Sequence, residues 1–144
     1  MNLRDILRTK GADVVTIRQD ASLLEAAREL REHNIGVLLV MDGAEHPAGI
    51  ISERDVVSLL AERGSIDGLT VQDAMSRELI VCVPTDSVDY AMQVMTQKRI
   101  RHLPVMDGER LAGLVSIGDL VKSHISQAET EIRYLHSYIQ GVRT

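Results

Sequence analysis

The chain has 144 residues, a formal net charge of -5, no Phe or Trp and a single cysteine. The negative charge argues against a nucleic-acid partner, because binding to phosphate backbones depends on clustered Lys and Arg, and one cysteine excludes an intrachain disulfide or a cysteine-rich metal site. No apolar run is long enough for a signal peptide or a membrane span, so we expect a cytoplasmic protein with no membrane partner, in which Cys82 is a buried strand residue.

The first half of the chain predicts a short helix at 3–7 and then a β-α-β-β-α unit. Strands are expected at 14–17, 37–41 and 48–51, and helices at 22–33 and 53–63. Ser22 and Glu25 have the spacing of a capping box at the start of an apolar helical period. Asp42 and Gly43 stand between two strand-like runs, where a tight turn needs positive φ.

The second half predicts the same order of elements. A short helix at 71–75, which Thr70 and Asp73 can cap, leads into strands at 79–83, 102–106 and 111–115. Helices are expected at 87–98 and from 117 onward. Gly64 to Gly68 supplies a turn between the halves.

The two halves are copies of one unit. Residues 34–43 align with 99–108 at an offset of 65, and residues 49–55 align with 113–119 at an offset of 64. A unit of about 60 residues is marginal by itself, so the two copies are expected to fold as one body with a ligand cleft between them. The predicted fold class is α+β, divided into repeat 1 with its lead-in helix (1–66), repeat 2 (67–125) and a C-terminal helical extension (126–144).

The end of the chain carries one apolar stripe along a helix. Its members follow spacings of 4, 3, 4, 3 and 4: Val121, Ile125, Ala128, Ile132, Leu135 and Ile139. The stripe either packs on its own repeat or pairs with the same helix of a second copy in a homodimer.

Both copies contain the pattern Gly-h-h-Ser-x-x-Asp, where h is aliphatic. Ser52 and Asp55 occupy it in the first copy, and Ser116 and Asp119 occupy it in the second. Ser-x-x-Asp after a strand is usually a capping box. The same spacing places a hydroxyl, free helix N–H groups and a carboxylate where a ribose diol and an anion can bind, and its occurrence at the same place in both copies favours a ligand site.

These motifs resemble the tandem cystathionine-β-synthase (CBS) domain pair, or Bateman module, over about residues 1–125. The resemblance rests on the matched segments 15–23 and 80–88, the apolar strands after Ile35 and Ile100, and the two Gly-h-h-Ser-x-x-Asp segments. It implies two βαββα repeats packed about a pseudo-two-fold axis. It also implies a regulatory module that binds AMP, ADP, ATP, NAD(H) or S-adenosylmethionine between the repeats.

The resemblance also implies two sites, each with an adenine wall from the opposite repeat. The first site has Asp119 and Ser116 at the ribose, and its wall is formed by Thr16, Ala21, Ile35 and Gly36. The second has Asp55 and Ser52, with Val81, Asp86, Ile100 and Arg101 as the equivalent wall. Its match is poorer, because Asp86 replaces a small residue.

Arg101 and His102, where the first copy has Gly36 and Val37, resemble the phosphate-contacting position of the family. Arg can hold two phosphate oxygens, so the Asp119 site is predicted to be the tighter one. Arg54 is either a second phosphate contact or an exposed helix residue. His102 is either a ligand contact or a structural hydrogen-bonding residue.

The predicted function is a non-catalytic regulatory module that binds an adenine nucleotide and alters an unidentified protein effector. No Walker-type or GxGxxG sequence, nucleophile–base pair or metal-ligating spacing is found, so we assign no catalytic residue, no metal and no required cofactor. We expect a homodimer without an attached catalytic domain. The alternatives are a dimerisation scaffold that needs no ligand and a module that binds S-adenosylmethionine.

Overall fold

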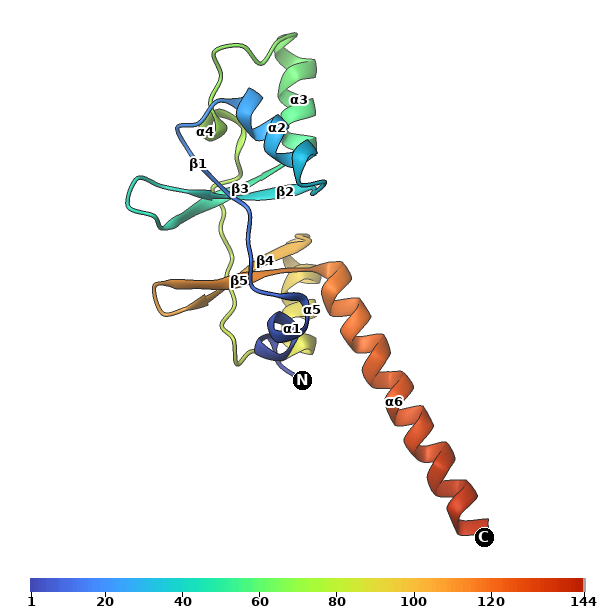
Figure 1. The fold of residues 1–144 in the computed structure, drawn as a ribbon. Coiled ribbons are helices and arrows are strands. Elements are labelled where there is room, and N and C mark those ends of the chain that lie inside the picture. Colours follow the sequence, from blue (N-terminus) through green and yellow to red (C-terminus); the bar gives the residue numbers. More distant parts are fainter. Residues whose placement is uncertain (144) are drawn as a thin grey trace. The chain divides into compact units, whose positions relative to one another are not determined.

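The computed structural model describes the backbone of residues 1–143 and the side chains of residues 1–136. It contains two compact units. One is formed by Asp13–Ile80, and the other by Met1–Ala12 together with the chain from Val81 onward. Each unit holds one copy of the repeated helix-and-strand arrangement, so the predicted α+β fold is confirmed (Figure 1).

The unit formed by Asp13–Ile80 is built on a three-stranded sheet. Strand β1 (Thr16–Arg18) runs parallel to β2 (Val37–Met41), which pairs antiparallel with β3 (Pro47–Ser52). The helices are α2 (Leu23–Glu32), α3 (Glu53–Arg63) and α4 (Val71–Ala74). The core is aliphatic, with Leu23, Leu30, Leu38, Val40 and Ile51 among its buried residues.

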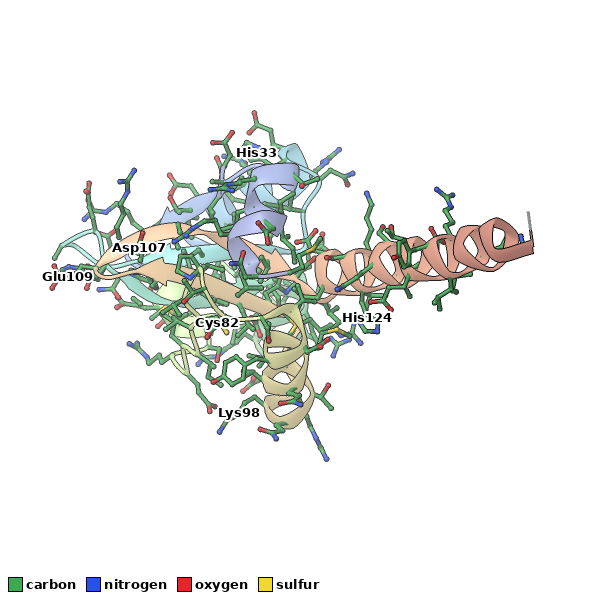
Figure 2. The ribbon with its side chains drawn as sticks, turned by 90° about the horizontal axis from the view of Figure 1, so that it is seen from below. His33, Cys82, Lys98, Asp107, Glu109 and His124 are labelled. Carbon is green, nitrogen blue, oxygen red and sulfur yellow. The ribbon has the colours of Figure 1, made fainter. Side chains whose placement is uncertain are left out.

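The other unit is built on an antiparallel pair of strands, β4 (His102–Asp107) and β5 (Arg110–Ser116). Asp107 and Glu109 mark the tip of this hairpin (Figure 2). The helices are α1 (Leu3–Lys10), α5 (Val88–Lys98) and α6 (Ile117–Arg143).

Each lead-in helix lies in the compact unit of the other copy, and not in the unit of the copy that follows it in the sequence. The sequence places α1 with repeat 1, but Met1–Ala12 belongs to the compact unit of the second copy. The amides of Leu3 and Arg4 donate to the carbonyls of Asp86 and Pro84, each at 3.0 Å. Helix α4 stays in the unit of the first copy, where the amide of Leu23 donates to the carbonyl of Leu69.

A glycine in each copy allows this helix packing. A Cβ atom on Gly113 would lie 2.6 Å from a methyl carbon of Leu7 on α1. A Cβ atom on Gly49 would collide with the carbonyl oxygen of Ser76, just after α4. At Gly49 any side chain would strike this backbone oxygen, whereas at Gly113 the end of the Leu7 side chain would have to shift. The two copies therefore use the same contact, although each lead-in comes from a different part of the chain.

The predicted strand at 79–83 is the one predicted element that does not form. Only Cys82 pairs: its amide donates to Pro104 at 3.0 Å, and its carbonyl accepts from Met106 at 2.8 Å. In the first copy the flanking bonds of the equivalent strand are Leu39 N–H to Val15 and Gln19 N–H to Met41. The residues equivalent to the donors Leu39 and Gln19 are Pro104 and Pro84, which have no N–H.

Helix α6 leaves the rest of its unit after the first turns. Leu120 is fully buried, whereas Ile125, Ile132 and Leu135 are 52%, 66% and 58% exposed. Figure 1 shows the helix running away from α1, α5 and the two strands. The described part of the stripe therefore does not pack on its own repeat, and the side chain of Ile139 lies outside the described residues. Among the described residues, no helix combines the length and the hydrophobicity that a membrane span requires.

Candidate functional site

The Ser-x-x-Asp pattern forms a capping box in both copies. The Ser116 amide donates to Oδ2 of Asp119 at 2.8 Å, and the Asp119 amide donates to Oγ of Ser116 at 3.1 Å. Ser52 and Asp55 make the same two bonds at 2.8 and 3.2 Å. The structural interpretation of the motif is therefore correct at both places, and any ligand would meet a carboxylate already fixed by its own helix.

Asp119 differs from Asp55 in having a lysine of α1 against its carboxylate. The Nζ atom of Lys10 donates to Oδ2 of Asp119 at 2.7 Å and to the carbonyl of Leu114 at 2.8 Å. Burial acts to raise the pKa of Asp119, but the hydrogen bonds from Lys10 and Ser116 outweigh it, so the pKa lies below its ordinary value. Asp119 is thus held as an anion. Among the described residues, none makes an ion pair with Asp55.

In the second copy, the side chain of Lys10 donates a hydrogen bond to the strand carbonyl whose counterpart in the first copy accepts from a backbone amide. Ile50 is the counterpart of Leu114, and its carbonyl accepts from the Ser76 amide at 2.9 Å. Helix α4 ends at Ala74, so the chain reaches Ile50 directly, whereas α1 continues to Lys10 and only a side chain reaches Leu114. Lys10 is not among the residues predicted from the sequence, because it precedes the first copy. The shared capping pattern of Asn2 with Asp5 and Thr70 with Asp73 was the available signal.

Arg101 and His102 lie at the same end of the β4–β5 pair as Asp119. His102 is the register partner of Ser116, and the carbonyl of Arg101 accepts from the amide of Ile117, where α6 begins. Burial lowers the pKa of His102, and the charges of Lys10 and Arg101 lower it further, while Asp119 opposes them. His102 is therefore neutral at pH 7 and able both to donate and to accept a hydrogen bond.

A cavity of about 340 Å³ lies between α1 and α6 beside this cluster. Lys10 and Asp119 form part of its lining, together with Ile6, Thr9 and Ser123. The lining therefore includes the Asp119 carboxylate and apolar side chains such as Ile6. The site thus combines a fixed anion, a neighbouring ammonium group and an accessible hollow.

The first copy brings its predicted residues together at the corresponding place. The carbonyl of Gly36 accepts from the amide of Glu53, Val37 is the register partner of Ser52, and Arg54 is exposed. The backbone arrangement matches that of the second copy. The arginine and histidine side chains of the second copy have no equivalent here, since Gly36 and Val37 replace Arg101 and His102.

The predicted adenine walls belong to the opposite compact units. Thr16, Ala21, Ile35 and Gly36 lie in the unit formed by Asp13–Ile80, whereas Asp119 lies in the other unit. Val81 and Ile100 lie in the unit of Asp119, as does Asp86, whose carboxylate accepts from the Val83 amide at 2.8 Å. The pairing of each wall with its ribose carboxylate stays a prediction.

One known domain family matches both copies of the repeat. The family model described as "CBS domain" matches residues 3–62 and again residues 71–125. The chain belongs to the CBS domain family. The two matches make it a tandem CBS pair, as the repeated motifs predicted, and each match covers one sequence copy.

Individual relatives agree with this assignment. The chain is 35% identical to the CBS domain-containing protein CBSX3, mitochondrial, of Arabidopsis thaliana, over 96% of this chain and 72% of the relative. It is 40% identical to the CBS-domain protein ATU1752 of Agrobacterium tumefaciens, with a TM-score of 0.80 over 85% of this chain and 92% of that structure.

A third similar protein was solved with ligands. The CBS pair of protein MJ0100, in complex with 5′-methylthioadenosine and S-adenosylmethionine, is 27% identical, with a TM-score of 0.77 over 88% of this chain and 98% of that structure. That CBS pair therefore binds adenosine-containing molecules. In this chain, the described residues contain no cluster of three or more His, Cys, Asp or Glu that could hold a metal ion.

Proposed function

We propose that this CBS pair is a non-catalytic regulatory module that binds a phosphorylated adenosine compound, namely AMP, ADP, ATP or NAD(H). The observation that carries the proposal is the contact of Lys10 with the fixed carboxylate of Asp119, at the end of the β4–β5 pair where Arg101 and His102 also lie. The ligands of the similar MJ0100 structure support the adenosine part of the proposal.

Each residue of the cluster has a chemical role in this proposal. Asp119 accepts hydrogen bonds from the ribose hydroxyls, and Ser116 stands beside it at the end of β5. Arg101 and Lys10 contact phosphate oxygens, and neutral His102 donates a further hydrogen bond. Thr16, Ala21, Ile35 and Gly36 form the adenine wall.

The same chemistry makes the two sites unequal. The Asp119 site has an ammonium group 2.7 Å from its carboxylate, and Arg101 and His102 lie at the same end of the β4–β5 pair. The Asp55 site has Ser52, with Arg54 as its cation and Val81 and Ile100 in its wall. We therefore propose that nucleotide occupies the Asp119 site first.

Ligand binding to both copies would act through linkage. A ligand that contacts both repeats favours one relative orientation, by no more than its difference in affinity between orientations. A protein effector that contacts the same surfaces then senses the ligand. We propose that the module works as a homodimer on such an effector.

The test is a thermal-shift series on protein freed of carried-over ligand, with AMP, ADP, ATP, NAD⁺, NADH and S-adenosylmethionine. A ligand that binds the folded state raises its stability by about 2.7 kcal/mol at a hundredfold excess over Kd. Asp119→Asn should weaken binding roughly tenfold or more, because a hydrogen bond to a charged group contributes about 1.5–3 kcal/mol.

Asp55→Asn is the matched control, because it alters the same capping box in the other copy. It should leave the tighter binding event unchanged. Equal losses from both variants would contradict the assignment to Asp119. A shift with S-adenosylmethionine alone would replace the phosphate assignment with the alternative of a module that binds S-adenosylmethionine.

The second candidate function is a dimerisation scaffold that needs no ligand. The exposed stripe on α6 favours it, because Ile125, Ile132 and Leu135 find no partner within the described part of the chain. If none of the six compounds shifts the ligand-free protein at millimolar concentration, the scaffold becomes the better interpretation.

A further inference from the structure

The exposed part of α6 carries a continuous stripe of apolar side chains. Ile125, Ile132 and Leu135 are all more than half exposed, and Val121 is 38% exposed. Ala128 is exposed between them. These residues fall on one stripe of a helix that the structure follows from Ile117 to Arg143. A contiguous apolar stripe on a projecting helix is typical of a helix that has a partner.

The stripe has the composition of a two-stranded parallel coiled coil. With Ile125 at position a of a heptad, Ile132 is the next a residue, and Ala128 and Leu135 occupy d. Ile at a with Leu at d favours two parallel strands, and Ile125, Ile132 and Leu135 match this rule. Val121 and Ala128 fill the other d positions. The sequence continues the pattern with Ile139 at a, so the repeat reaches nearly three heptads.

The flanking positions match a second copy of the same helix. In a parallel pair, each g residue faces the e residue five positions further along the partner helix. Glu131 at g then faces His136 at e, and His124 at g faces Glu129 at e. Both are pairs of a carboxylate with an imidazole. His124 also lies 3.6 Å from Asp89 of α5 in its own chain, and Figure 2 shows it near the start of α6.

The opposite orientation has unfavourable charges. In an antiparallel pair whose two stripes overlap along their full length, each e residue faces an e residue of the partner helix, and each g residue faces a g residue. Glu129 then faces Glu129 of the other copy, and Glu131 faces Glu131. Like charges at these positions select against a pairing. Charge and core composition therefore favour the same orientation.

We propose that α6 is an interface with a second copy of this chain, formed as a parallel two-stranded coiled coil along Val121, Ile125, Ala128, Ile132 and Leu135. The interface is separate from the Asp119 site and forms without nucleotide. It places the two copies of the CBS pair at the same end of the paired helices.

Light scattering on the full chain tests the interface. The wild-type protein should have twice the protomer mass of 15.9 kDa at tens of micromolar. Ile132→Asp buries a charge in the seam and should halve the measured mass. Thr130→Asp adds the same charge in the same turn at the outer f position and should leave the mass unchanged. A monomeric wild type, or an Ile132→Asp protein with the wild-type mass, overturns the proposal.

A cysteine variant tests the orientation without depending on the loss of an oligomer. Leu135→Cys places a thiol at a d position, which meets its own copy only in a parallel pair. Mild oxidation should convert most of this variant to a covalent dimer on a non-reducing gel. The wild type, whose Cys82 is buried, is the control and should stay uncrosslinked. An uncrosslinked Leu135→Cys protein contradicts the parallel arrangement.

Discussion

The Nζ atom of Lys10 and the Oδ2 atom of Asp119 lie 2.7 Å apart, although 109 positions separate them in the chain. The contact joins the end of α1 to the first turn of α6. It also gives the second copy a cation that has no counterpart at Asp55 among the described ion pairs. Lys10 and a ribose diol would therefore compete for the same carboxylate, and a phosphate could take the ammonium group in exchange.

The first prediction concerns the acid stability that this pair provides. Because the pKa of Asp119 is lowered in the folded protein, the unfolded chain takes up the proton first as the pH falls. The contribution is fully present above the unfolded pKa of about 3.9 and is lost as the pH falls through the lower folded value. Asp119→Asn should cost about 0.5–1 kcal/mol near neutral pH.

Urea unfolding of the wild type and Asp119→Asn at about pH 7 and pH 3 measures this difference. Asparagine keeps an acceptor for the Ser116 amide, so the variant isolates the charge. The gap between the two proteins should shrink in acid. An equal difference in the free energy of unfolding at both pH values would show that the difference does not come from the ion pair.

The second prediction concerns the imidazole of His102. Burial and the neighbouring cations lower its pKa, so its NMR titration midpoint should fall below the ordinary 6.5. Lys10→Met removes one of those cations and should raise the midpoint toward that value. Bound nucleotide phosphate should raise it further, because a nearby anion favours the charged imidazolium.

Proton or nitrogen NMR of the ring, with and without the nucleotide that gives the largest thermal shift, makes this measurement. Lys122→Met is the control, since Lys122 does not contribute to the shift of His102. An unchanged midpoint in Lys10→Met would mean that Lys10 does not lower the pKa of His102, and would weaken the assignment of Lys10 to the cationic cluster.

The third prediction compares the two glycines beneath the lead-in helices. Gly49→Ala drives a methyl group into the Ser76 backbone carbonyl, whereas Gly113→Ala meets the flexible end of the Leu7 side chain. Overpacking of this kind costs about 1–3 kcal/mol. Gly49→Ala should lie toward the upper end and Gly113→Ala toward the lower end.

Chemical denaturation of the two variants against the wild type checks the order. Gly43→Ala is a suitable control, because Gly43 does not have the positive φ that the sequence predicts for this turn, which Glu45 adopts instead, and a Cβ atom at Gly43 meets nothing within 4 Å. If Gly113→Ala costs more than Gly49→Ala, the side chain of Leu7 is fixed as rigidly as a backbone.

The fourth prediction concerns the missing strand at 79–83. Pro104→Leu supplies the residue that the first copy has at Leu39, together with an N–H that can donate to the carbonyl of Ile80. The residue 104 amide should then exchange slowly with deuterium, as we also expect of the hydrogen-bonded Leu39 amide. The net stability should change by less than about 1 kcal/mol, because losing proline loosens the unfolded chain while the new bond stabilises the folded one. Fast exchange at residue 104 would show that more than the prolines prevents the strand.

The sequence by itself determined the tandem α+β repeats, most of the strands and helices, and the two capping boxes, because these depend on local periodicity and on spacings of three or four residues. It also placed Arg101 and His102 at one strand end beside Asp119. A pattern of apolar residues could not reveal that Pro84 and Pro104 remove the flanking bonds of Cys82, since those bonds join segments that are about 20 residues apart.

Tertiary structure alone decided which copy each lead-in helix joins, and with it the place of Lys10. That contact spans most of the chain, and no local propensity encodes it. The exposure of α6 was decided in the same way. Its stripe is equally suited to packing on its own repeat or to pairing with a second helix, and only the direction in which α6 leaves β5 left Ile125, Ile132 and Leu135 facing outward.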